Sequence, residues 1–363
     1  VITNYGKSLK KVKNAEVDVY VPRFPKYKDD QPFKVVRVKS VRSADGYYQG
    51  MPGIDGKLKK TLKENKYDVI HIHSPFTMGR FFARYGKKHG IPTVFTFHTK
   101  FKEDFVRILH AKPLVGFMMR YIMTTINACD HVLTVSDGAA EVLRSYGYKK
   151  EITVIRNGTD LVYPANAAEL AAQVEEKHAL AGQKNVFLSV GRIVENKRLD
   201  LVLDALKIVK ERGVDFRFLV VGDGSYKEKL ENKAKDLALA DRVIFTGKVM
   251  DRALLSGYYL RSDLFMFPST FDTASLAPIE AAALKLPSLM TRGCSTAEIV
   301  TENRNGFLAG DTAESWADEI CRIVTDENLL TQAKENCYRE VYRTWDDVCG
   351  EVYDFYEKAI ASK

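Results

Sequence analysis

The stretch that decides the fold is NVFLSVGRIVENKRLDLVLDALKIVKERGVDFRFLVVGDGS, residues 185–225. Two apolar runs, 185–192 and 216–224, enclose a segment whose apolar residues recur at helical spacing. Those residues are Leu199, Val202, Leu203, Leu206 and Val209. A helix between two nearly continuous apolar strands is typical of a parallel sheet that helices cover on both faces. The stretch therefore predicts an α/β fold.

The same alternation recurs along the rest of the chain. Further strands are predicted at 15–22, 67–74, 92–98, 131–138, 151–158, 242–247, 263–269 and 286–291. The segment RNGTDLVYPANAAEL, 156–170, separates two groups of strands. We therefore predict two Rossmann-like domains, 1–160 and 161–344, with a ligand in the cleft where their strand ends meet. A last helix, at about 345–363, is expected to pack back on the first domain.

Composition excludes several classes of protein. The chain has 363 residues, 45% hydrophobic and 28% charged, as ordinary globular proteins do. PLVGFMM, 113–119, is far shorter than the ~20 residues of a spanning helix, so no transmembrane segment is predicted. Five scattered cysteines argue against a disulfide framework and fit a reducing cytoplasm. VITNYGKSLKKVK, 1–13, has helical spacing and no Met before it, so we expect residues to be missing ahead of it.

Charge divides the chain unevenly. Residues 1–150 hold 28 Lys and Arg against 13 Asp and Glu, a balance of +15, whereas residues 151–363 have a balance of −7. A basic half can meet phosphates of anionic lipid or of nucleic acid, or it can be no more than a solvated surface. A basic nucleic-acid-binding protein is one alternative, but the chain shows neither aromatic platforms nor a recognised binding motif.

Two cations follow the strand at 185–192. Arg192 lies directly after it, and Lys197 lies five residues on, before the next helix. An Arg that forks across two oxygens and a Lys that adds a point charge suit a diphosphate. The spacing is not that of a P-loop. Gly222, in the loop GDGS, has no third glycine of a dinucleotide motif after it, so that signal is weak.

Two acids lie in STFDTASLAPIEAAALKLP, residues 269–287. Asp272 is predicted in a loop, Ser275 as the residue that caps a helix, Pro278 in its first turn and Glu280 early in the helix. A helix N-terminus favours an anion. We therefore expect an anionic leaving group here, flanked by carboxylates that accept from sugar hydroxyls.

At this point the chain resembles a known family. VGRIVENKRLD, FLVVGDGSYKEKL, RVIFTGKV, the two acids eight residues apart and AEIVTENRNGFL follow in the order of family 4 of the retaining glycosyltransferases, which have the GT-B fold. VIHIHSPFTMGRFFARYGKKHGIPTVFTFHTKF and RNGTD are similar to its first domain. The resemblance implies transfer of a hexose, from UDP-glucose by our expectation, by front-face attack without an obligatory metal or other cofactor.

The resemblance also implies roles for single residues. Arg192 and Lys197 would hold the donor diphosphate, Asp272 the sugar hydroxyls and Glu280 the ribose. The catalytic set would be His98, Asp272, Arg192 and Lys197, with His98 near the sugar. Further donor contacts would come from Gly222, Gly247, Lys248, Ser275 and Leu276. His71 and His73 share a strand face and with His98 raise the alternative of a metal, but no further ligand completes a site, so packing is expected.

Two features depart from the family pattern. Asp272 stands where the family has a Glu and is one methylene shorter, which puts the choice or the placement of the sugar in doubt. The family also opens with a strand and a glycine-rich loop that this sequence lacks. We read this as truncation.

The acceptor is predicted from residues 101–126, which mix apolar side chains with Lys102, Arg107, Lys112 and Arg120. An apolar stripe rimmed by cations can lie in a membrane interface. FDTASL and FTFHTKF resemble members that glucosylate diacylglycerol. We therefore expect a lipid acceptor and a cytoplasmic protein on the inner face of the plasma membrane. The alternatives are a helix packed within its own domain, a cell-surface polysaccharide acceptor and a sugar-nucleotide epimerase. The sequence does not determine the oligomeric state.

Overall fold

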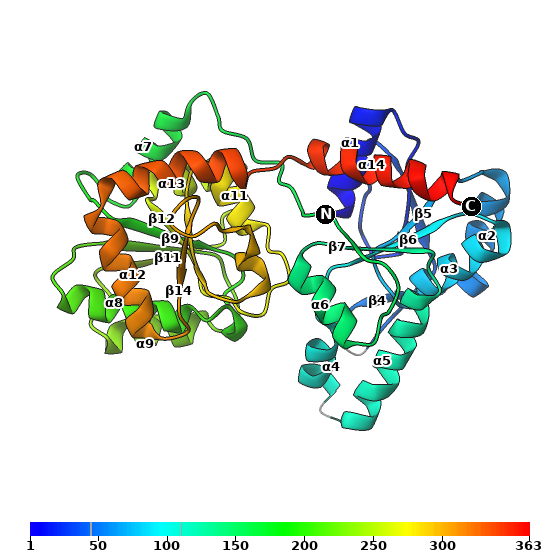
Figure 1. Ribbon diagram of the computed structural model, residues 1–363, viewed down its shortest axis with the longest axis horizontal. Helices are drawn as coiled ribbons and strands as arrows, with labels where there is room; N and C mark the ends of the chain where they lie inside the picture. Colours follow the sequence, from blue (N-terminus) through cyan, green and yellow to red (C-terminus); the bar gives the residue numbers. More distant parts are fainter. Residues whose placement is uncertain (44–45, 110) are drawn as a thin grey trace. The chain divides into compact units, whose positions relative to one another are not determined.

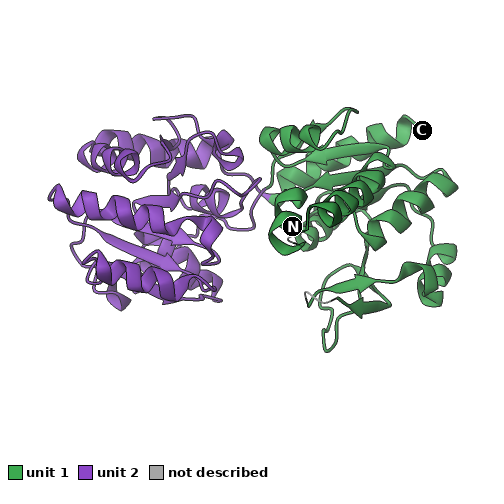
Figure 2. Cartoon of the chain, turned by 90° about the horizontal axis from the view of Figure 1, so that it is seen from below, with its two compact units in different colours: residues 1–157, 345–363 green, residues 158–344 purple. Residues whose placement is uncertain are grey.

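The computed structural model describes residues 1–43, 46–109 and 111–363. The chain forms two compact units, coloured separately in Figure 2. Unit 1 comprises Val1–Asn157 and Trp345–Lys363, and unit 2 comprises Gly158–Thr344. Both units are built on parallel strands with helices packed on them (Figure 1), so the predicted α/β fold is confirmed.

Unit 2 contains a six-stranded parallel sheet in the order β11-β10-β9-β12-β13-β14. Its strands are β9 (Val186–Val190), β10 (Arg217–Val221), β11 (Val243–Gly247), β12 (Leu264–Phe267), β13 (Ser288–Thr291) and β14 (Phe307–Ala309). Its helices are α7 (Ala167–Lys177), α8 (Leu199–Glu211), α9 (Lys227–Asp236), α10 (Arg252–Arg261), α11 (Ala277–Ala283), α12 (Ala313–Thr325) and α13 (Glu327–Glu340). Short 3-10 turns, η2 (Glu195–Lys197) and η3 (Ser295–Ile299), lie in its loops.

The central strands of this sheet are buried on both faces. Phe187 and Phe218 pack with α8, α9 and α12, whereas Val186, Leu188 and Leu219 pack with α7, α10 and α11. Successive strand residues point to opposite faces, so a strand between two helical layers must be apolar at every position. This explains why the strand runs at 185–192 and 216–224 show no polar alternation.

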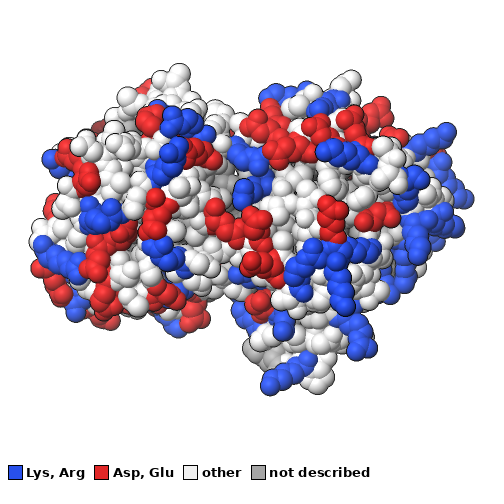
Figure 3. Space-filling model, in the orientation of Figure 1, with Lys and Arg blue, Asp and Glu red and all other residues white. Residues whose placement is uncertain are grey.

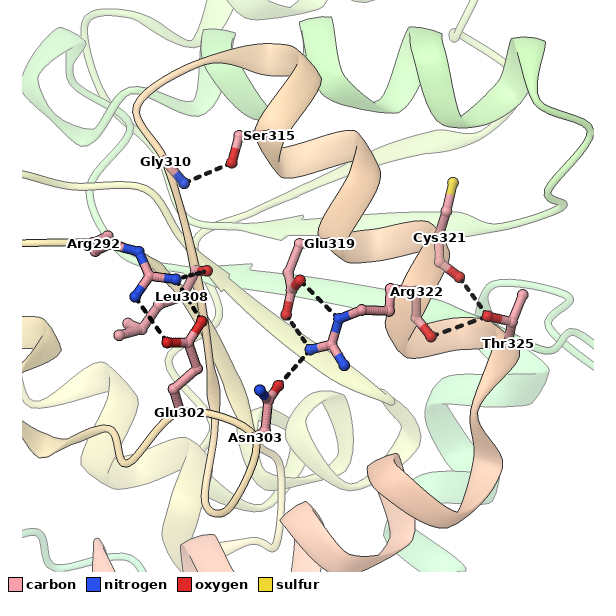
Figure 4. Close-up of polar contacts among 10 residues, drawn as sticks. All are labelled: Arg292, Glu302, Asn303, Leu308, Gly310, Ser315, Glu319, Cys321, Arg322 and Thr325. Atoms are coloured by element: carbon pink, nitrogen blue, oxygen red, sulfur yellow. Dashed lines mark hydrogen bonds and ion pairs between the residues drawn. The ribbon is translucent and has the colours of Figure 1, made fainter.

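The sequence analysis did not find β14. Its residues follow the polar loop TENRNG and form only a three-residue strand. Figure 4 shows the contacts that hold it: Arg292, after β13, pairs with Glu302 and donates to the Leu308 carbonyl at 3.1 Å. The Gly310 amide donates to Ser315 Oγ at 2.7 Å, which ties the end of β14 to α12. β14 lies at the edge of the sheet and is held by these polar contacts, which leave no periodic pattern of apolar residues in the sequence.

Unit 1 contains a four-stranded parallel sheet in the order β5-β6-β7-β8 and two small sheets, β1-β2 (parallel) and β3-β4 (antiparallel). The strands are β1 (Asp18–Pro22), β2 (Lys34–Val38), β3 (Ser40–Arg42), β4 (Tyr48–Gly50), β5 (Ile70–Ile72), β6 (Thr93–Phe97), β7 (His131–Thr134) and β8 (Thr153–Val154). The helices are α1 (Ile2–Lys13), η1 (Pro52–Ile54), α2 (Gly56–Glu64), α3 (Thr77–His89), α4 (Phe101–Leu109), α5 (Lys112–Asn127), α6 (Asp137–Ser145) and α14 (Trp345–Ala361). The strands β2, β3 and β4 were not predicted.

The last helix, α14, packs against the first, α1, within unit 1. The Tyr5 and Trp345 rings lie 5.6 Å apart, and Lys11 Nζ pairs with Asp346 at 2.5 Å. Buried rings and an ion pair thus join the two ends of the chain in one unit. In the described part of the chain, no helix combines the length and the apolar character needed to span a membrane.

Candidate active site

A hollow opens at the carboxyl ends of β9, β10 and β12 in unit 2. Its empty volume is about 310 Å³ and includes space open to solvent. Arg192, Lys197, Phe267, Pro268 and Ser269 are among the residues that line it. In parallel sheets the carboxyl ends of adjacent strands meet at one edge, which is where such folds place their ligands. Three loops far apart in the sequence therefore contribute to one surface.

Lys197 and Asp272 meet directly at this hollow. Lys197 Nζ lies 2.8 Å from Oδ1 and 2.7 Å from Oδ2 of Asp272, and each side chain is 22% exposed. The ammonium also lies 5.5 Å from the centre of the Phe267 ring. Thr296 Oγ1 donates to the Asp272 carbonyl at 3.1 Å and so fixes the loop that carries the acid. Lys197, the predicted cation, and Asp272, the predicted acid, thus form an ion pair at the hollow.

Arg192 differs from Lys197. It is exposed beside the hollow, and its guanidinium has no ion pair or hydrogen bond with any residue that the structure describes. Its five N–H donors are thus available to an anionic ligand, since an Arg fork matches phosphate and carboxylate oxygens. The hollow therefore has two cations: Arg192, which has no partner among the described residues, and Lys197, which is paired with a carboxylate.

Backbone hydrogen bonds donated by two glycines hold the loops around the hollow close together. The Gly222 amide donates to the Gly247 carbonyl at 2.9 Å, and the Gly191 amide donates to the Val221 carbonyl at 3.0 Å. Gly222 has φ +147°, and a Cβ there would lie 1.8 Å from the Gly191 oxygen. Only glycine fits that approach. Gly247 has φ +73°, and the next residue, Lys248, is exposed with no side-chain partner in the described chain.

The predicted cap at Ser275 is wrong. Helix α11 begins at Ala277, and the residue before it is Leu276, whose carbonyl accepts from the Glu280 amide at 2.8 Å. Ser275 therefore lies one residue too early to cap, and the N-cap residue Leu276 makes no side-chain cap hydrogen bond in the described chain. Pro278 does lie in the first turn, as expected. Within the described residues, the amides of Ser275 and Leu276 donate to no other group.

Glu280 lies in the first turn of α11 with 15% of its side chain exposed. The Tyr259 hydroxyl donates to Oε2 at 3.1 Å, and a guanidinium nitrogen of Arg252 lies 3.6 Å from Oε1. Burial raises the pKa of the Glu280 carboxyl above its ordinary value, whereas Arg252 and Tyr259 act in the opposite direction. Sequence reasoning did not find Arg252 and Tyr259, because both lie on α10 in a segment with no recognisable motif.

His98 belongs to unit 1, where it forms a cluster with two other histidines. His98 Nε2 lies 2.9 Å from His73 Nδ1, and His71 contacts the Tyr356 hydroxyl and Thr96 Oγ1. Burial lowers the pKa of His98 to about 4 and that of His71 to about 3, so both rings are neutral near pH 7. The described residues hold no group of three or more His, Cys, Asp or Glu placed to bind a metal ion. The role of His98 near a sugar stays a prediction.

The predicted acceptor region forms two helices, α4 and α5, that are packed on one face and exposed on the other. Phe105, Val115 and Ile122 form their shared buried cluster. The outward side chains are Val106, Ile108, Leu114 and Phe117, which are 54%, 52%, 43% and 64% exposed. The four basic residues predicted here, Lys102, Arg107, Lys112 and Arg120, are exposed too. The helices α4 and α5 thus pack within unit 1 on one face and present apolar side chains to solvent on the other.

Basic side chains also gather on α2 and α3 of unit 1. Figure 3 shows Lys and Arg crowded along the side of unit 1 where α2 lies. The two helices are joined by a hydrogen bond from the Tyr85 hydroxyl to the Leu62 carbonyl, at 3.0 Å. The exposed members are Lys57, Lys59, Lys60, Lys63, Arg84, Lys87 and Lys88. Of these, only Lys60 has an acidic partner in the described chain, Glu64, at 3.7 Å.

Known structures define the class of the fold. The chain aligns with the sucrose-phosphate synthase of Thermosynechococcus elongatus at a TM-score of 0.79 and 18% identity, over 100% of this chain and 93% of that one. It aligns with Anabaena HepE in complex with UDP and glucose at a TM-score of 0.75 and 17% identity, over 98% and 94%. The two parallel-sheet units of this chain thus have the GT-B fold.

Family models assign the chain more narrowly. Residues 1–163 match the model described as Glycosyltransferase Family 4, and residues 171–340 match Glycosyl transferases group 1. The chain belongs to glycosyltransferase family 4, whose members are retaining hexosyltransferases. This membership favours neither of the two other classes considered, the epimerase and the nucleic-acid-binding protein.

Characterised relatives differ in their sugars. A GDP-mannose-dependent alpha-(1-6)-phosphatidylinositol dimannoside mannosyltransferase of Mycobacterium tuberculosis is 27% identical over 80% of this chain and 74% of its own. The alpha-monoglucosyldiacylglycerol synthase of Streptococcus pneumoniae is 27% identical over 71% and 59%. An Escherichia coli UDP-Gal:alpha-D-GlcNAc-diphosphoundecaprenol alpha-1,3-galactosyltransferase is 28% identical over 84% and 79%. A nucleotide-sugar donor is common to the family, and the sugar varies.

Proposed function

We propose that this enzyme transfers glucose from UDP-glucose to a lipid hydroxyl at an anionic membrane surface. The observation that carries the donor site is the hollow with unpaired Arg192 beside the Lys197–Asp272 pair. Arg192 and Lys197 bind the diphosphate, and Asp272 accepts from sugar hydroxyls. Glu280 accepts from the ribose hydroxyls. The amides of Ser275 and Leu276 and the loops at Gly222, Gly247 and Lys248 contact the rest of the donor.

Donor binding then exchanges the partners of one ion pair. Lys197 turns from Asp272 to the diphosphate, and Asp272 is released to the sugar hydroxyls. As the anomeric C–O bond to the diphosphate breaks, Arg192 and Lys197 stabilise the negative charge that develops on the leaving oxygen. The acceptor oxygen bonds to the anomeric carbon on the same face, and its proton passes to the departing diphosphate. The anomeric configuration is retained.

The donor is tested by thermal unfolding with a series of sugar nucleotides. A ligand at 100 times its Kd raises the free energy of unfolding by about 2.7 kcal/mol. We expect the largest rise in Tm with UDP-glucose, less with UDP-galactose and GDP-mannose, and none for the Arg192→Met variant with UDP-glucose. A larger rise with GDP-mannose would contradict the proposed donor, and no rise with any sugar nucleotide would contradict the site.

The lipid acceptor rests on the surface of unit 1. The outward face of α4 and α5 presents Ile108 and Phe117 to solvent beside exposed cations, and α2 and α3 add a basic surface. Apolar side chains rimmed by Lys and Arg bind the boundary between lipid headgroups and acyl chains, and each cation near an anionic membrane contributes about 1 kcal/mol. The relatives from Mycobacterium tuberculosis, Streptococcus pneumoniae and Escherichia coli, whose names include phosphatidylinositol, diacylglycerol and diphosphoundecaprenol, support the choice of a lipid-linked acceptor.

Co-sedimentation with liposomes tests the surface. We expect binding to vesicles that contain anionic lipid at low salt, with less binding as salt rises and on vesicles of neutral lipid alone. The double variant Ile108→Ser/Phe117→Ser should bind more weakly. The double variant Lys57→Gln/Lys59→Gln should lose about fivefold in affinity for each charge removed.

The matched control is Val162→Ser, because Val162 is an exposed apolar residue of unit 2, at 60%, outside the proposed surface. It should bind as the wild type does. Absence of binding even at low salt would rule out the membrane surface, and equal loss in the control would show that the effect is not specific to α4 and α5.

A further inference from the structure

Tyr259 is a buried residue whose hydroxyl contacts a carboxylate. Tyr259 lies on α10, and its side chain is fully buried. Its hydroxyl lies 3.1 Å from Glu280 Oε2. A carboxylate can only accept, so the hydroxyl donates. A buried hydroxyl without a partner destabilises a protein, so the hydrogen bond between Tyr259 and Glu280 is favoured in the folded state. Because Tyr259 is held in the core, this bond fixes the Glu280 side chain in one orientation.

Arg252 contacts the other carboxylate oxygen. It lies seven residues, about two turns, before Tyr259 on α10. Its guanidinium is placed between Glu280 Oε1, at 3.6 Å, and Asp160 Oδ1, at 2.5 Å. Asp160 belongs to the segment by which the chain enters unit 2. Arg252 is therefore anchored by one acid while it faces the other. The two oxygens of Glu280 each retain a free lone pair for a ligand, since each has a single partner in the described residues.

We propose that Arg252 and Tyr259 are positioning residues that hold the Glu280 carboxylate aimed for the ribose hydroxyls of the donor. This rests on the proposed function, in which Glu280 binds the ribose. Neither residue touches the reacting atoms. They fix the direction of the carboxylate and its charge, and Asp160 keeps the Arg252 guanidinium in place.

The charge of Glu280 is set by opposing effects. Burial favours the neutral acid and raises the pKa of Glu280, Arg252 and the Tyr259 hydroxyl lower this pKa, and the Asp160 carboxylate raises it. These are the charged and titratable groups that face Glu280 in the described chain. Loss of Arg252 or Tyr259 raises the pKa of Glu280, so the carboxylate becomes protonated at a higher pH. Binding that needs the carboxylate is then lost at a higher pH as the solution is acidified.

The adjacent residue on α10 provides a matched control. Tyr258 is also fully buried, and its hydroxyl contacts His178 Nε2 at 2.7 Å and not Glu280. Tyr258→Phe and Tyr259→Phe each remove one oxygen from one buried ring of the same helix. A structural effect should be similar in both variants, whereas an effect on Glu280 should occur only in the second.

The experiment measures the Kd of UDP and of GDP by calorimetry from pH 5 to pH 8. We expect Tyr259→Phe and Arg252→Gln to weaken binding of the nucleotide that the wild type prefers by about tenfold and to move its acid limb to higher pH. Arg252→Lys should restore part of the affinity and the limb. Tyr258→Phe should leave both unchanged, although its Tm falls as that of Tyr259→Phe does.

The outcomes separate the inference from the proposed function. Unchanged Kd and pH limb in both Tyr259→Phe and Arg252→Gln, beside a weakened Glu280→Gln variant, would overturn the positioning roles alone. Normal binding by Glu280→Gln would overturn the ribose role of Glu280 and with it the inference. Arg252 is 48% exposed, so its variants should fold even if Tyr259→Phe does not.

Discussion

Replacement of Lys197 by Met is expected to lower kcat with UDP-glucose about 10²- to 10³-fold, the effect of removing one placed donor of positive charge from a transition state. The ammonium lies at the hollow, and among the described residues its partners are Asp272 and the Phe267 ring. The free energy of unfolding should fall by no more than about 1 kcal/mol, because the ion pair is partly exposed. Activity and stability therefore separate, as measured by steady-state kinetics and thermal unfolding.

The control for this variant is Lys233→Met. Lys233 Nζ pairs with Asp204 at 2.6 Å between α9 and α8, with exposure of 30% and 42%. It resembles the Lys197 pair in chemistry and lies away from the hollow. Its kcat should equal that of the wild type. A loss of kcat below about fivefold in Lys197→Met would contradict the diphosphate role, because it corresponds to only about 1 kcal/mol of transition-state stabilisation.

Replacement of Asp272 by Ala is expected to lower kcat/KM about 100-fold or more. Two charge-assisted hydrogen bonds to sugar hydroxyls would be lost, each contributing about 1.5–3 kcal/mol. The Lys197 ammonium would also lose the carboxylate that orients it. Steady-state kinetics with UDP-glucose and the Asp204→Ala variant as control measure the effect, and full activity in Asp272→Ala would contradict the site.

The longer acid at this position gives a second result. Asp272→Glu restores the residue that the family pattern has, and we expect it to keep activity within about tenfold of the wild type while its preference among sugars changes. A double-mutant cycle of Lys197→Met and Asp272→Ala should show strong non-additivity, because the two side chains are in contact. Additive losses would show that the two residues act independently.

The parallel sheets could be predicted from sequence because their strands are apolar at every position. Phe187 and Leu188 pack on opposite faces of the same sheet, and this double burial leaves a clear pattern. The strands β3, β4 and β14 are three residues long and, unlike the equally short β5, do not lie within a longer apolar run. The start of α11 was placed one residue early because Ser275 has the chemistry of a cap, whereas the backbone begins the helix after Leu276.

Part of the candidate site could be predicted from the sequence for a related reason. Arg192, Lys197 and Asp272 lie in loops that follow strands, where a charge stands out after an apolar run, and Glu280 lies in the first turn of the next helix. Their pairing did not follow from the sequence, since Lys197 and Asp272 are 75 residues apart and meet only because β9 and β12 are neighbours in the sheet. Arg252 and Tyr259 lie within a helix among ordinary helical residues, and only their contacts with Glu280 distinguish them.

The most direct test of the proposed activity is product analysis by nuclear magnetic resonance. The protein is incubated with UDP-glucose and vesicles that contain diacylglycerol and an anionic lipid, and the lipid fraction and the nucleotide fraction are examined separately. We predict a glucosyl lipid with the α configuration, as in UDP-glucose, together with UDP. A β-linked lipid, or an epimerised sugar nucleotide with no glucosyl lipid, would contradict the account.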